Sequence, residues 1–320
     1  MECPKCNSLV SAKARFCDQC GANLVKDVTF LHHKALEQYH RGLIDEALYL
    51  WEEALKENPE FTKAHYYKGL ALYDRGELQL AVASFKKALK GEKEPFRVYF
   101  KLGLAQYGLG DLAASVESYR QALELNQKSA ETHYRLGLSY LRNSDLENAQ
   151  EALEAAVRIN PEYTRALYIL GMVHSQKGDN LSAIEKFRFV VTISPSYIAA
   201  RFELGMALFK EGLLKEAADE FEKAVSSKNR FAPGHFMLGE AYRKLGEFSL
   251  AIGAYTEVLK LNPKDADTYV RLAECNLQLD LLDAAAKALG QALVLNPNNR
   301  DAQYLQAHLK EMNTPHKPGF

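Results

Sequence analysis

The feature that most constrains this chain is a self-similarity of its sequence that recurs every 34 residues. Small residues occur at this interval, at Ala35, Gly69, Gly103, Gly137, Gly171, Gly205, Gly239 and Ala273. Seven residues after each of them comes a turn position, held by Gly42, Gly76, Gly110, Ser144, Gly178, Gly212, Gly246 and Asp280. An unbroken period of this length predicts a repeat architecture, which grows by adding units and not around one central core.

The second half of each unit has the spacing of a helix. Each turn position is followed after five residues by a small side chain, after four more by a large one, and after three more by a small one. The large side chains are Trp51, Phe85, Tyr119, Leu153, Phe187, Phe221, Tyr255 and Leu289. This spacing places the series on one helix face. The small residue that precedes the turn lies in the first helix of the unit. It allows the two helices to approach closely, and the large side chain fills the space beside it. Glycine permits the tight turn because it takes positive φ without steric cost.

The pattern resembles the tetratricopeptide repeat family over residues 28–299. The resemblance implies an all-α fold, a right-handed superhelical solenoid of eight helix-turn-helix units. The units are 28–61, 62–95, 96–129, 130–163, 164–197, 198–231, 232–265 and 266–299. Proline ends five of them, at Pro59, Pro161, Pro195, Pro263 and Pro297. The departures are Ser144 and Asp280 at the turn and Lys93, Gln127 and Asn229 at the proline position. We expect them to loosen local turns without breaking the register.

The segment after the last repeat begins another first helix that has no partner. Residues 300–312 place polar side chains along one side, and we expect them to form a capping helix that covers the apolar end of the array. Residues 313–320 contain Pro315, Pro318 and Gly319 and predict a frayed, flexible tail.

Four of the five cysteines fall within the first 20 residues, in two pairs with CxxC spacing. Cys3, Cys6, Cys17 and Cys20 offer the four thiolates that structural zinc prefers. Residues 1–26 resemble the short zinc ribbons written CPxCG…FCxxCG, with Asn7 at the place of the first glycine. So short a segment buries little apolar surface, so that one structural Zn²⁺ would supply its folding energy.

The sequence supports other roles for these cysteines less well. An iron site of rubredoxin type has the same ligands, and a redox CxxC is disfavoured because two pairs in one short segment favour one metal. A catalytic zinc would need an open coordination position, which four cysteines do not leave. The fifth cysteine, Cys275, is expected to be a small buried hydrophobe. Only Asn23–Asp27 separates the ribbon from the first helix, which favours a docked cap.

The resemblance implies that the first helix of each repeat lines a concave groove. Three columns of residues then face this groove. The first runs His32, Tyr66, Phe100, Tyr134, Tyr168, Phe202, Phe236 and Val270; the second Leu36, Leu70, Leu104, Leu138, Met172, Met206, Glu240 and Glu274; the third Tyr39, Tyr73, Tyr107, Leu141, Ser175, Phe209, Arg243 and Leu277. Part of this apolar content belongs to the repeat architecture, because an aromatic stripe at helical spacing is usually core.

The second column carries the functional prediction. Family members often place asparagine there to hold a peptide backbone, and this chain has leucine and methionine. We therefore expect a hydrophobic trough that binds an apolar peptide or an amphipathic helix, in place of a charged chaperone tail. The partner-binding candidates are Tyr66, Leu70, Phe100, Leu104, Tyr107, Tyr134, Leu138, Met172, Phe202 and Met206.

Composition and motifs narrow the function classes. A net charge of −1 gives no reason to expect nucleic acid or an anionic membrane as partner, and no apolar run is long enough to span a bilayer. Met1–Pro4 lacks the features of a signal peptide, so we place the protein in the cytoplasm. The chain has no catalytic motif or phosphate-binding loop, which predicts a non-enzymatic interaction scaffold without a small-molecule substrate. The alternative is a zinc-ribbon regulator of nucleic-acid machinery that recruits partners through its repeats.

Overall fold

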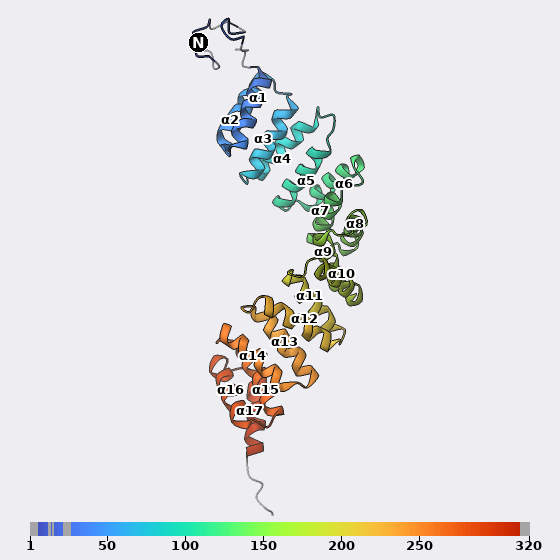
Figure 1. Ribbon diagram of the computed structural model, residues 1–320, viewed down its shortest axis with the longest axis vertical. Helices are drawn as coiled ribbons and strands as arrows, with labels where there is room; N and C mark the ends of the chain where they lie inside the picture. Colours follow the sequence, from blue (N-terminus) through green and yellow to red (C-terminus); the bar gives the residue numbers. More distant parts are fainter. Residues whose placement is uncertain (1–5, 12–13, 15, 22–26, 314–320) are drawn as a thin grey trace, which may run out of the picture. The chain divides into compact units, whose positions relative to one another are not determined.

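The computed structural model describes residues 6–11, 14, 16–21 and 27–313. Its helices are α1 (Val28–His40), α2 (Ile44–Glu57), α3 (Thr62–Asp74), α4 (Leu78–Leu89), α5 (Phe96–Leu109), α6 (Leu112–Leu125), α7 (Ala130–Arg142), α8 (Leu146–Ile159), α9 (Thr164–Gln176), α10 (Asn180–Ile193), α11 (Ile198–Lys210), α12 (Leu214–Ser227), α13 (Ala232–Leu245), α14 (Phe248–Leu261), α15 (Ala266–Gln278), α16 (Leu282–Leu295) and α17 (Arg300–Asn313). No β-strand occurs among the described residues, so the fold is all-α, as predicted. The chain divides into two compact units, Met1–Pro161 and Glu162–Phe320, each a stack of helical hairpins (Figure 1).

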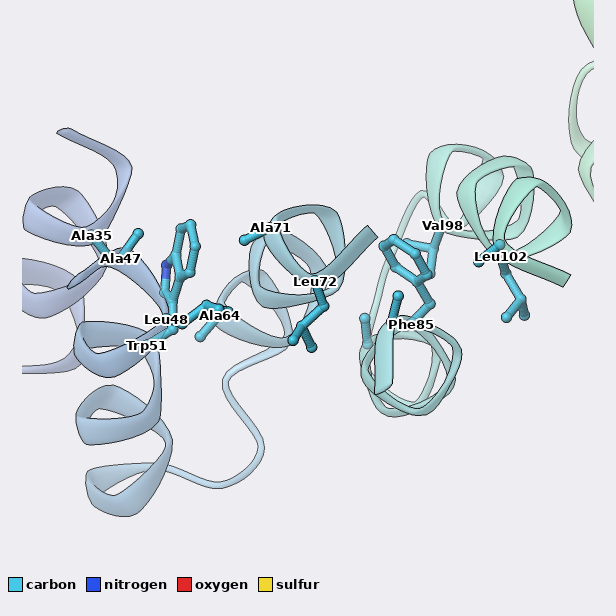
Figure 2. Packing of buried hydrophobic residues seen from close by; sticks show 13 residues of the cluster. Ala35, Ala47, Leu48, Trp51, Ala64, Ala71, Leu72, Phe85, Val98 and Leu102 are labelled. Atoms are coloured by element: carbon cyan, nitrogen blue, oxygen red, sulfur yellow. The ribbon is translucent and has the colours of Figure 1, made fainter. Parts of the chain in front are cut away.

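Each hairpin closes around the small and large residues that the repeat pattern contains. The buried cluster around the first hairpins contains Trp51 and Phe85, both with no exposed surface, together with alanines and leucines (Figure 2). A Cβ added to Gly69 would lie 2.6 Å from a ring atom of Phe85. The helices can therefore pack this closely only because glycine has no side chain.

The turn positions have the backbone that the sequence predicts. Gly42, Gly76 and the other turn glycines have positive φ, and so do their replacements Ser144 (φ 60°) and Asp280 (φ 57°). The hairpin turn therefore keeps its left-handed residue when the glycine is lost. A non-glycine residue is strained in this conformation, by about 1 kcal/mol or more.

We expect Asp280→Gly to stabilise the second unit. The substitution relieves the left-handed strain, and the greater freedom of glycine in the unfolded chain offsets part of the gain, leaving up to about 1 kcal/mol. Asp280 is exposed, so no packing is lost. Urea denaturation measures the change, and Gly246→Asp is the reciprocal control that should destabilise. A lower stability of Asp280→Gly would show that the aspartate side chain contributes an interaction that outweighs the strain.

The register survives where the closing proline is missing. Helix α4 ends at Leu89, two residues earlier in its repeat than α2, and the linker to α5 carries Gly91 and Pro95. Helix α5 nevertheless begins at Phe96, 34 residues after Thr62 begins α3. The loss of Pro at Lys93 thus changes one connection and leaves the period intact.

The last helix packs on the end of the second unit. Helix α17 contacts α15 and α16, and its Ala302 and Leu309 are buried, while Tyr304 is 71% exposed. Its position is that of the predicted cap, and most of the predicted tail lies outside the described residues. No helix in the described part of the chain is both long and apolar enough to cross a membrane.

Candidate functional site

Three of the four predicted metal ligands come together near the N-terminus. The Sγ atoms of Cys6, Cys17 and Cys20 all lie within 4.8 Å of one another, and those of Cys6 and Cys17 are 3.6 Å apart. Thiolates bound to one tetrahedral zinc at about 2.3 Å each are separated by roughly 3.8 Å. The three sulfurs therefore fit one metal ion. Cys3, the fourth predicted ligand, lies outside the described residues.

The backbone around the cysteines has the turns that a CxxC knuckle needs. Asn7 (φ 58°) follows Cys6 and Gly21 (φ 67°) follows Cys20, both in the left-handed region, and the Gly21 amide donates to the Cys17 carbonyl. Asparagine takes this conformation more readily than most residues. The departure from glycine at Asn7 is therefore accommodated.

Ser8, which no sequence pattern singled out, lies within hydrogen-bonding distance of two of the sulfurs. Ser8 Oγ is 2.9 Å from Cys6 Sγ and 3.3 Å from Cys17 Sγ. This hydrogen bond, with backbone amides of the second knuckle, lowers the pKa of the Cys17 thiol to about 6 although burial opposes the shift. The thiolate, which is the ligating form, is thus favoured at neutral pH. Cys275 is the opposite case, because burial raises its pKa to about 11.

In the first unit the first helices of successive hairpins form one side. α1 contacts α3, α3 contacts α5 and α5 contacts α7, whereas no comparable contact joins α2, α4, α6 and α8 within the residues described. The first helices are therefore closer together than the second helices. The face of this unit that α1, α3, α5 and α7 form is its concave face.

Rings of the first predicted column belong in part to the core. Tyr66 packs on Phe85 and Phe100 on Tyr119, with centroids 6.0 Å apart, and Tyr134 is only 8% exposed. In the second unit Phe202 packs on Phe221 at 5.7 Å and touches the next loop through Phe231. Each of these recurring contacts joins the first helix of a repeat to its own second helix, so the column helps to hold each hairpin together.

Two rings of the third column lie partly under a cation of the following repeat and keep some exposed surface. The Arg142 guanidinium lies 5.1 Å over the Tyr107 ring and donates to the Tyr107 carbonyl, and the Lys244 ammonium lies 4.4 Å over Phe209. Both cations stand 35 residues after the ring they cover. This periodic relation is readable in the sequence, and we did not predict it.

Second-column residues keep part of their apolar surface exposed. Leu70 packs against the buried cluster of the first hairpins, and Met172 and Met206 against that of the second unit, yet all remain partly exposed. None of the ten partner-binding candidates is among the most exposed apolar side chains of the described residues. Seven of them lie in the first unit and three in the second. A continuous trough over all of them stays a prediction.

In the last two repeats the second column consists of Glu240 and Glu274, and neighbouring arginines neutralise their charges. Arg243 lies 2.8 Å from Glu240 and 3.7 Å from Glu274, and Arg271 lies 2.8 Å from Glu274 and 3.6 Å from Glu240. Tyr255 donates to Glu240 as well. The network leaves Arg243 paired on two sides, so it offers no open anion site.

A pocket of about 570 Å³ opens between α1, α3 and α5, which we call the α1–α3–α5 pocket. Its apolar lining comes from Leu36, Phe61, Tyr66, Tyr67 and Val98, and its polar lining from Thr29, His32, His33, Lys63, Glu92, Glu94 and Arg97. All of these residues lie in the first unit, and Leu36 and Tyr66 belong to the predicted groove columns. Tyr66 is the one partner-binding candidate that lines the pocket.

His32 forms the buried wall of this pocket. It is 4% exposed, and Trp51 Nε1 donates to its Nδ1 at 3.1 Å. Because Nδ1 accepts, the neutral ring carries its proton on Nε2. Burial, with His33 and Lys63 nearby, lowers the pKa of His32 to about 4.

We expect the first unit to lose stability as the pH falls from 6.5 toward 4. In the unfolded chain His32 binds a proton near pH 6.5, whereas in the folded chain it does so only near pH 4. The stability that is present above pH 6.5 is therefore lost between these two pH values, by at most about 3 kcal/mol. His32→Gln keeps an acceptor for Trp51 but cannot titrate. Urea denaturation at the two pH values should show a smaller loss in the variant, and an equal loss would exclude His32 as the cause.

Comparison with known proteins agrees with this architecture. Family models described as tetratricopeptide repeat match residues 34–97, 134–198, 195–235 and 236–304, and another described as TPR repeat matches 107–144. No curated protein matches the chain.

Among solved structures, MamA is 29% identical over 55% of this chain and 96% of its own, with a TM-score of 0.51. MamA from Desulfovibrio magneticus RS-1 is 25% identical over 54% and 98%, also with a TM-score of 0.51. A tetratricopeptide repeat protein from Parabacteroides merdae is 20% identical over 78% and 98%, with a TM-score of 0.55. Because the repeat models match well over half of its length, the chain belongs to the tetratricopeptide repeat family.

Proposed function

We propose that this protein is a non-enzymatic scaffold that binds a partner protein on the face formed by its first helices. The bound element is an apolar peptide or an amphipathic helix. The eight units between residues 28 and 299 supply this face, with α17 as the cap. The proposal rests on the second column, which presents leucine and methionine at positions where packing leaves surface exposed.

The composition of this column favours apolar recognition over charge. Leu70, Leu104 and Leu138 recur at the same place in three consecutive repeats of the first unit, next to aromatic rings. Leucine, methionine and aromatic side chains supply the apolar surface that interface cores use. The self-paired network around Glu240 and Arg243 further disfavours an electrostatic site in the last repeats.

Crosslinking in the native organism, followed by identification of the captured proteins, tests the scaffold proposal. A protein captured through residues of the first helices supports it. Copurifying nucleic acid that is lost in salt would support the alternative, a regulator of nucleic-acid machinery, and count against the scaffold.

We also propose that Cys6, Cys17 and Cys20, with Cys3 as the fourth ligand, hold one structural Zn²⁺. Three clustered sulfurs and two left-handed knuckle residues support this. The ion would crosslink a segment whose Leu9 (84%) and Phe16 (61%) are exposed and which thus has little core. The thiolates orient and hold the ion, and four of them leave no coordination position for a substrate.

Cys17→Ser should abolish metal binding while leaving far-UV helicity nearly unchanged. The helices are stabilised by contacts with their neighbours in the array, and none of the helices contains a predicted ligand. Elemental analysis of untagged protein should give one zinc per chain for the parent and none for the variant, with Cys275→Ser as the control that keeps its zinc. Metal-free parent protein, or a collapse of helicity in Cys17→Ser, would contradict the proposal.

A further inference from the structure

Helix α17 has the pattern of a first helix, and the side chains that a second helix would cover are exposed. In the complete repeats of the second unit, the first-column ring packs on the large residue of its own second helix, as Tyr168 does on Phe187 with centroids 5.9 Å apart. Tyr304 has the same place in the period, yet it is 71% exposed. Ala307 is also exposed, whereas Ala273, one period earlier, has no exposed surface. The contact that closes a hairpin is therefore unmade at α17.

These two side chains belong to a longer exposed row along the helix. Four exposed residues follow one another at intervals of four, three and four positions, which places them on one face of α17. We call this row the open stripe, and it consists of Arg300, Tyr304, Ala307 and Glu311. Leu309 lies on the opposite side of the helix, where it is buried in the cluster formed with α15 and α16. The open stripe thus points away from the rest of the second unit.

The charges at the two ends of the open stripe do not suit the helix itself. Asp301 in the first turn and Lys310 in the last turn have the signs that the helix dipole favours. Arg300 at the first position and Glu311 in the last turn have the opposite signs. The stability of α17 therefore does not explain these two residues, whereas pairing with another helix would.

Two copies of the open stripe complement each other when the helices run antiparallel. About a two-fold axis at the middle of the stripe, Arg300 faces Glu311 of the second copy and Tyr304 faces Ala307 of the second copy, and each pair occurs twice. A parallel pair would instead place like charges opposite each other at both ends, which is unfavourable. The sequence of the stripe therefore selects one orientation.

The residues that flank the open stripe are compatible with the same arrangement. Antiparallel pairing brings Asp301 beside His308 of the second copy, and Gln303 beside Lys310 of the second copy. No two like charges meet at these edges. The spacing is also that of the a and d positions of a coiled coil, at which two helices pack side by side.

We propose that the protein forms a weak homodimer in which the α17 helices of two copies pair antiparallel through the open stripe. The Tyr304 ring of each copy covers Ala307 of the other, which closes the contact that a second helix closes in the complete repeats. One helix pair is small beside the roughly 1,000 Å² that a stable interface buries, so we expect association only at micromolar concentrations. The interface uses none of the ten partner-binding candidates and is independent of the scaffold proposal.

Sedimentation equilibrium of the whole chain at increasing concentration tests the dimer. The mass of the parent should rise from 36.0 kDa toward twice this value. Tyr304→Glu should weaken association at least about 100-fold, because it removes both rings and adds two carboxylates to the interface. Tyr49→Glu replaces another exposed tyrosine, on α2 of the first unit, and should leave association unchanged.

A charge exchange tests the orientation of the two helices. Arg300→Glu should weaken association about tenfold, because it places a carboxylate opposite Glu311 at both ends of the interface. Arg300→Glu combined with Glu311→Arg should restore it at an unchanged net charge. Both changes suit the helix dipole, so α17 should remain folded in the variants, which circular dichroism checks.

A parent chain that stays at 36.0 kDa at every concentration would overturn the inference and leave the open stripe to a helix of another protein. Association that survives Tyr304→Glu would place the interface elsewhere on the molecule. Failure of the charge exchange to restore association would overturn the antiparallel pairing and, with it, the proposed dimer.

Discussion

Gly205→Val should destabilise the second unit by about 3 kcal/mol, enough to unfold it at moderate temperature. A Cβ at this place in α11 would lie 2.6 Å and 2.7 Å from two ring atoms of Phe221, and valine adds two further methyl groups. Phe221 has no exposed surface, so its ring has no space to move into. The helices would have to separate, which disrupts the close contact that recurs in the six repeats with glycine at this position.

The control for this experiment is the same substitution at an open glycine. Gly253 lies in α14, and nothing stands within 4 Å of the Cβ that valine would add there. Since valine is no worse than glycine in a helix, Gly253→Val should be neutral or slightly stabilising. Urea denaturation compares the two variants. Equal stabilities would mean that the close approach at Gly205 does not limit the packing of the hairpin.

Leu104→Glu combined with Leu138→Glu should weaken partner binding at least about 100-fold. Both side chains retain exposed surface on first helices of the first unit, and in the proposed complex each glutamate would be buried without a partner. Binding by the parent should change little between low and moderate salt, because salt screens charges and not apolar contacts. Isothermal titration calorimetry with the identified partner measures both effects.

A matched pair of leucines on the second helices serves as the control. Leu80 in α4 is 55% exposed and Leu125 in α6 is 52% exposed. Leu80→Glu with Leu125→Glu adds the same charge to the same unit and should leave affinity unchanged. Circular dichroism must show that the groove variant remains folded. Unfolding would show that the second column is core, and a steep loss of parent binding with salt would indicate an electrostatic site.

The sequence predicts the repeats well because each local requirement recurs at one interval. The close pair of Gly205 and Phe221 has a counterpart in other units, and so has the turn residue Gly76, whose place is held by Ser144 two repeats later. One interpretation is therefore tested many times along the chain. Even the departures followed from backbone chemistry, since Asn7, Ser144 and Asp280 all adopt the left-handed conformation that glycine would.

Interactions that occur once could not be predicted in this way. The Trp51–His32 bond depends on a tryptophan and a histidine that occupy these positions in one repeat alone, and Ser8 has no counterpart in the period. The paired charges of Glu240 and Arg243 also depend on side-chain geometry across repeats. The exposed fraction of each groove residue could be obtained only from the three-dimensional structure, because one aromatic ring can face both the core and the groove.

Site-specific photo-crosslinking tests the central claim, that the first helices form the binding face. A photoreactive phenylalanine analogue is placed in turn at Tyr107 in α5, on the concave face, and at Tyr49 in α2, which is 61% exposed on a second helix. With the partner bound, we predict efficient crosslinking from position 107 and little from position 49. Efficient crosslinking from position 49 with none from position 107 would contradict the account.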